Sequence, residues 1–93
     1  MGKAKRAKPE KLAEKLTAIR ESLGLTHEEL ISRLDCPQIP LYRASISQYE
    51  SGKSEPPLPV LLKYARLAGI TMDVLADDEM KLGEYFPKGK KAQ

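Results

Sequence analysis

The sequence predicts a single all-α domain of five helices, and three observations support this prediction. Apolar residues recur at spacings of three and four along several segments, and no segment alternates apolar and polar residues as a strand does. Prolines and glycines stand at the ends of these segments, where they start or stop helices. The length of 93 residues suits one hydrophobic core. We therefore expect a compact helical unit with its function on the surface.

The composition is that of a folded, water-soluble chain, with 41% hydrophobic and 31% charged residues. No apolar run approaches the roughly 20 residues that a membrane-spanning helix needs. The basic start of the chain is not followed by the apolar segment of a signal peptide. We expect a cytoplasmic protein without a membrane partner.

Cysteine and histidine are too few for a disulfide or for a metal site of the usual kind. Cys36 and His27 are single residues of their types, so no intramolecular disulfide and no set of four ligands can form from them. Cys36, His27 and Asp35 could be written as nucleophile, base and orienter, but Cys36 and Asp35 adjoin in a proline-rich loop with no implied pocket. We expect no enzyme, no catalytic residue, no metal and no cofactor.

Positive charge is concentrated at the start of the chain. Residues 1–20 hold seven Lys or Arg against two Glu, a net charge of +5, although the whole chain carries only +3. Residues 1–8 are expected to form a flexible basic arm. Such an arm can attract nucleic-acid phosphates by counterion release, or it can be a solvated terminus with no partner.

The first helix is expected from Pro9 to Leu23. Proline suits the first helical position, and Gly24 suits the left-handed residue that follows a helix. One inward stripe runs along this helix, formed by Leu12, Leu16, Ile19 and Leu23.

Two short helices should follow, separated by a loop. Thr26 and Glu29 have the spacing of a capping box, which predicts a helix from Thr26 to about Leu34. Pro37 and Pro40 make residues 35–42 a loop. The next helix should run from roughly Tyr42 to Ser51, where Gly52 stops it.

The fourth and fifth helices complete the domain, which we expect to span residues 9–78. Pro59 can open the fourth helix and Gly69 can end it. Its inward face is expected to hold Leu61, Leu62, Ala65 and Ala68. Thr71 should cap a fifth helix with Val74 and Leu75 facing inward.

Residues 79–93 are expected to form a C-terminal extension that is partly disordered. Its apolar residues could form one more helical turn or an extended strip against the domain. These residues are Met80, Leu82, Tyr85 and Phe86.

Together these signals resemble the lambda-repressor and Cro-like helix-turn-helix family, also called the XRE family, from about Leu12 to Leu75. Members of the family look like an arginine in the first helix, then Gly-Leu-Thr-x-Glu-Glu-Leu, Ile-Ser-x-x-Glu-x-Gly-Lys, a proline, and Leu-Leu-x-x-Ala-x-x-x-Gly-Ile. They stand here as Arg20, Gly24-Leu25-Thr26-His27-Glu28-Glu29-Leu30, Ile46-Ser47-Gln48-Tyr49-Glu50-Ser51-Gly52-Lys53, Pro56, and Leu61-Leu62-Lys63-Tyr64-Ala65-Arg66-Leu67-Ala68-Gly69-Ile70.

The resemblance implies that the helix at residues 42–51 lies in the major groove of DNA with its first residues at base edges. Arg43 can pair with guanine, Gln48 with adenine, and Ala44 can pack on a thymine methyl. For Arg43 a phosphate contact or a solvated side chain is the alternative. Ile46 and Tyr49 should instead face the core. The base-reading candidates are Tyr42, Arg43, Ala44, Ser45, Ser47 and Gln48.

The resemblance also implies phosphate contacts on either side of this helix. His27 stands where the family usually has a glutamine that reaches a phosphate and braces the recognition helix. Ser51 and Lys53, with the backbone around Gly52, look like the family's phosphate clamp. A plain exposed histidine and a plain surface lysine are the alternatives.

Arg20 and Glu50 match positions that form a partly buried ion pair in some family members. We interpret this pair as structural, holding the recognition helix in place without reading DNA. The loop at residues 35–42 departs from the family, because it is about five residues longer than the usual tight turn. It either touches the DNA backbone or is a solvated bulge.

The sequence therefore predicts a small regulator that binds double-stranded DNA as a homodimer on a two-fold operator and represses by occupying promoter DNA. The rival is an antitoxin-type or adaptor-type module that uses the same fold to bind a protein partner. That partner could dock through the apolar strip of the C-terminal extension, which could equally form a dimer contact or pack against the domain.

Overall fold

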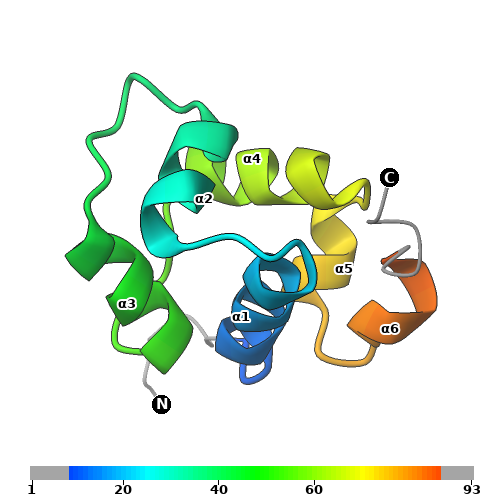
Figure 1. Cartoon of the computed structure of the whole chain (residues 1–93). Helices are drawn as coiled ribbons and strands as arrows, with labels where there is room; N and C mark the ends of the chain where they lie inside the picture. Colours follow the sequence, from blue (N-terminus) through cyan, green and yellow to red (C-terminus); the bar gives the residue numbers. More distant parts are fainter. Residues whose placement is uncertain (1–8, 87–93) are drawn as a thin grey trace, which may run out of the picture.

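A computed structural model describes residues 9–86, and the predicted basic arm at residues 1–8 and the end of the chain at residues 87–93 lie outside the described part. The described residues form an all-α domain without strands, as predicted (Figure 1). Six helices follow one another within residues 9–86, where five were expected. They are α1 (Leu12–Ser22), α2 (His27–Leu34), α3 (Arg43–Ser51), α4 (Leu58–Ala68), α5 (Met72–Ala76) and α6 (Leu82–Tyr85).

The helices pack as a closed group in which α3 and α6 occupy opposite ends (Figure 1). Helix α1 packs against α3 and α5, α2 against α3 and α4, and α4 against α5. One apolar core joins them. Its largest fully buried side chains are those of Leu16, Ile19, Leu30, Leu34, Ile46, Val60, Tyr64, Val74 and Leu75. None of the described helices is long and apolar enough to cross a bilayer.

The start of α1 corrects the prediction that this helix opens at Pro9. The helix begins at Leu12, three residues later. The Asp78 carboxylate accepts hydrogen bonds from the backbone N–H groups of Glu10 (2.9 Å) and Lys11 (3.0 Å). These donors are therefore satisfied by a residue far along the chain, which periodicity cannot reveal.

Lys15 makes a second long-range contact of α1, and its burial was not predicted from the sequence. Its ammonium donates to the carbonyl oxygens of Val74 (2.6 Å) and Asp77 (2.8 Å) at the C-terminal end of α5. Burial lowers the pKa of the Lys15 amine, although Asp78 and Asp77 act in the opposite direction. A cation at this end of a helix complements the helix dipole.

The inward face of α4 is rotated relative to the predicted one. Ala65 and Ala68 are buried as predicted, but Leu61 and Leu62 are only partly buried. The remaining buried positions of α4 are Val60 and Tyr64. The helix already begins at Leu58, so Pro59 is its second residue and not its first. The Tyr64 hydroxyl is buried without a hydrogen-bond partner in the described part, and burial raises its pKa.

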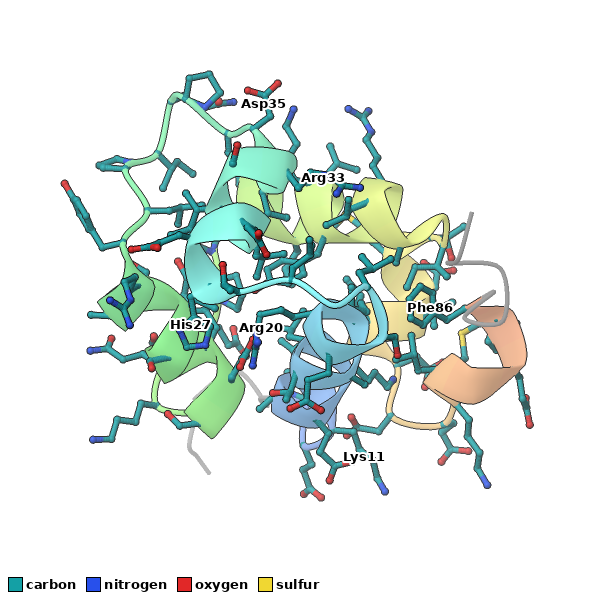
Figure 2. All side chains as sticks on the ribbon, viewed as in Figure 1. Lys11, Arg20, His27, Arg33, Asp35 and Phe86 are labelled. Carbon is teal, nitrogen blue, oxygen red and sulfur yellow. The ribbon has the colours of Figure 1, made fainter. Side chains whose placement is uncertain are left out.

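The segment after α5 contributes to the core through α6. Phe86 is buried, and Leu82 packs partly buried against the core, whereas the Tyr85 side chain is 46% exposed. Figure 2 shows Phe86 directed from the end of α6 toward the rest of the domain. The division of the chain at residue 78 stays a prediction.

Candidate nucleic-acid interface

Helix α3 presents one apolar and one polar face. Ile46 is fully buried and Tyr49 is 8% exposed, which confirms that both face the core. The opposite face is exposed and polar apart from one alanine. Its residues are Arg43, Ala44, Ser47, Gln48 and Ser51. This spacing of one, three, one and three residues keeps all five on one side of a helix.

Both ends of α3 are fixed by the local sequence. At the start, the Ser45 hydroxyl accepts a hydrogen bond from the backbone N–H of Tyr42 (3.1 Å). At the end, Gly52 has a φ of 83°, a left-handed conformation that residues with a side chain rarely adopt. This turn lets the Lys53 N–H donate to the Gln48 carbonyl at 3.0 Å. The predicted stop at Gly52 is confirmed.

An ion pair between α1 and α3 fixes α3 on the side opposite to its exposed polar face. Arg20 donates from Nε and Nη2 to the two carboxylate oxygens of Glu50, at 2.7 and 3.0 Å. The Arg20 and Glu50 side chains are 18% and 10% exposed. Hydrogen bonding to the Glu50 carboxylate raises the pKa of Arg20, and this effect outweighs that of burial. The predicted partly buried pair is confirmed, and its two parallel bonds fix orientation as well as distance.

His27 lies beside this pair in the first turn of α2. Its Nε2 is 3.6 Å from Glu50 Oε1, and its side chain is 26% exposed. Figure 2 shows His27 next to Arg20, between α1, α2 and α3. Helix α2 begins with the predicted capping box, in which Thr26 and Glu29 exchange two hydrogen bonds. His27 and Arg43, the first residue of α3, line the same surface hollow.

The loop at residues 35–42 is confirmed as a loop and is anchored to the domain (Figure 1). Cys36 is buried in the core, and its carbonyl accepts from the N–H of Ile39 at 3.1 Å. Ile39 and Leu41 pack against the core. The side chain of Tyr42, directly before α3, stays 65% exposed. Any DNA contact of this loop remains a prediction.

The end of α3 and the turn after it contain Ser51 and Lys53, the two residues for which phosphate contacts are predicted. The Ser51 hydroxyl donates to the Gln48 carbonyl at 3.2 Å. Lys53 is exposed and makes no ion pair with the described part of the chain. Both residues are close to the end of the polar face of α3, as a clamp beside a groove-reading helix requires.

All nine predicted DNA-binding residues thus lie in the first turn of α2, in α3 or at its two ends. Glu28 was not among the predicted residues, although its carboxylate is 3.9 Å from Arg43 Nη1. The sequence does contain one signal for an acidic neighbour. Arg43 is a cation at the start of a helix, where the helix dipole favours an acidic residue.

A family model described as helix-turn-helix matches residues 16–75, more than half of the chain. The chain therefore belongs to the helix-turn-helix family, of the lambda-repressor-like type predicted from its motifs. This membership implies DNA binding. No curated protein and no solved structure gave a significant match.

Proposed function

We propose that the protein is a small transcriptional regulator that binds double-stranded DNA sequence-specifically, with α3 in the major groove, and represses by occupying promoter DNA. The observation that carries this proposal is the pairing of an exposed polar face on α3 with a rigidly held opposite face. Preorganised side chains lose little freedom on binding, which favours selective contacts. The proposed site comprises His27, Tyr42, Arg43, Ala44, Ser45, Ser47, Gln48, Ser51 and Lys53.

Charge distribution supports a role for the chain ends in this proposal. Residues 9–86 contain nine Lys or Arg against all thirteen Asp or Glu, a net charge of −4. Residues 1–8 carry four basic residues and no acid. We assign to this arm a sequence-independent attraction to phosphates that weakens with salt. Removing residues 2–8 should weaken binding to all sequences alike.

A two-fold homodimer on a two-fold operator is part of the proposal, as is action in the cytoplasm. Two copies of α3 would then enter successive major grooves, about 34 Å apart. Selection of bound duplexes from a random pool tests this directly. We expect enriched sequences with two inverted half-sites about one helical turn apart. Enrichment of single half-sites would remove the dimer, and no enrichment would remove sequence-specific binding.

A protein-interaction module is the second candidate, and the exposure of Tyr85 on α6 favours it. A gel shift with the selected duplex separates the two functions. A regulator should bind selectively and with salt dependence, whereas an adaptor should show no preference between selected and random duplex.

A further inference from the structure

The charges of α3 are reversed relative to the helix dipole. Arg43 occupies its first position and Glu50 its last turn, and these are its two formally charged residues. A helix is stabilised by acids near its start and by bases near its end. Each of these charges therefore interacts unfavourably with the α3 dipole, and a compensating interaction must come from outside α3. For Glu50 this is the bidentate bond to Arg20.

For Arg43 the neighbouring group is Glu28, in the first turn of α2. The distance from Arg43 Nη1 to Glu28 Oε2 is 3.9 Å, and the two side chains are 72% and 71% exposed. Both line a hollow of about 310 Å³ between the starts of α2 and α3. The other lining residues are Arg20, Thr26 and His27. Glu28 is thus a carboxylate on the face that would meet DNA.

A carboxylate at this place has two opposite effects on DNA binding. It repels phosphates, which weakens binding to any sequence. It also leaves Arg43 free to read a base while being held, because guanidinium has five N–H donors and guanine takes only two of them. The pair is loose and exposed, so it contributes little to folding. Its effect falls instead on the choice between sequences.

We propose that Glu28 is a positioning residue that sets sequence specificity by orienting the Arg43 guanidinium and by repelling DNA that offers this guanidinium no base. This inference rests on the proposed function, and in particular on Arg43 as a base-reading residue. Where a guanine edge is present, Arg43 bridges the base and Glu28. Where it is absent, Glu28 faces the duplex without compensation.

The test measures the affinity ratio between the duplex selected by the wild-type protein and a random duplex. Glu28→Gln keeps the shape of the side chain and removes its charge. We expect this variant to bind random duplex more tightly and to lower the ratio about fivefold, which corresponds to roughly 1 kcal/mol. Its melting temperature should stay close to the wild-type value, because the exposed pair and the exposed charge near the start of α2 contribute little to stability.

Three further variants separate positioning from net charge. Glu84→Gln makes the same charge change on α6, where Glu84 is exposed, and should leave the ratio unchanged. Glu28→Asp keeps the charge but withdraws the carboxylate from Arg43, and it should lower the ratio. In the Arg43→Ala background, Glu28→Gln should no longer lower it.

A wild-type ratio in Glu28→Gln would overturn the inference, and so would equal effects of Glu28→Gln and Glu84→Gln. In both cases the proposed function would stand, because the wild-type protein would still prefer its selected duplex. If the wild-type protein showed no such preference, the proposed function itself would fail and the inference with it.

Discussion

At the scale of single residues, Glu50 connects α1, α2 and α3 beside the proposed DNA interface. Its carboxylate accepts two bonds from Arg20 on α1 and lies 3.6 Å from His27 on α2. Glu50→Ala would leave a mostly buried guanidinium without its anionic partner, with only the hydrogen bond from Nη1 to the Leu25 carbonyl (3.0 Å) remaining. We expect a loss of roughly 2 to 4 kcal/mol of unfolding free energy, slightly below the usual cost for a fully buried pair. Urea denaturation measures it.

The exposed pair of Arg43 and Glu28 provides the matched control for this measurement. Glu28→Ala should cost less than about 1 kcal/mol, because water already screens that pair. If Glu50→Ala lost no more unfolding free energy than Glu28→Ala, the pair with Arg20 would not hold α3 in place.

Arg43 and Lys53 should differ in the kind of DNA affinity that they supply. Arg43→Ala should cost roughly 1 to 3 kcal/mol on the selected duplex and relax the preference at one base step, because a base contact is lost. Lys53→Ala should weaken selected and random duplex alike, because a phosphate contact carries no sequence information. Equal losses of Arg43→Ala on both duplexes would contradict its assignment as a reader.

At the scale of elements, the start of α1 depends on Asp78. Hydrogen bonds from the backbone N–H groups of Glu10 and Lys11 hold the pKa of this carboxyl below its usual value. A carboxyl whose pKa is lower in the folded state stabilises the fold above its unfolded pKa of about 3.9. This contribution is lost as the pH falls from there through the lower folded pKa.

We therefore expect Asp78→Asn to melt below the wild-type protein at pH 7, and the difference to shrink as the pH falls below about 4. Thermal melts between pH 7 and pH 2 measure this. Glu79→Gln, a neighbouring exposed acid, is the control and should show no such convergence. A constant difference between Asp78→Asn and the wild-type protein at every pH would contradict the assignment.

Helix ends also show how far the sequence predicts this fold. The capping box of Thr26 and the stops at Gly52 and Gly69 were predictable, because the groups involved are neighbours in the chain. The start of α1 was not, since Asp78 is 67 residues away from Lys11. Local patterns identify partners within a few residues only.

The same limit applies to the candidate interface. The inward side of α3 and the Arg20–Glu50 pair were predicted from spacing and from the family resemblance. Glu28 was missed, because its distance from Arg43 depends on how the anchored loop at residues 35–42 brings α3 back against α2. The longer the loop between two helices, the less their relative position can be predicted from local sequence patterns.

At the scale of the whole molecule, residues 9–86 form a domain with a net negative charge. On one side of this domain α3 exposes its polar face. Such a surface should contribute selectivity more than bulk attraction, because the excess of basic residues lies in the two chain ends. Affinity for random duplex should therefore fall steeply with salt, while the preference for the selected duplex should persist.

A competition experiment tests the central claim, that α3 reads DNA sequence, most directly. The selected duplex is bound at physiological salt and displaced by a scrambled duplex of the same length and base composition. The account predicts that about a thousandfold excess or more of scrambled duplex is needed for displacement. Displacement at equal concentrations would contradict it.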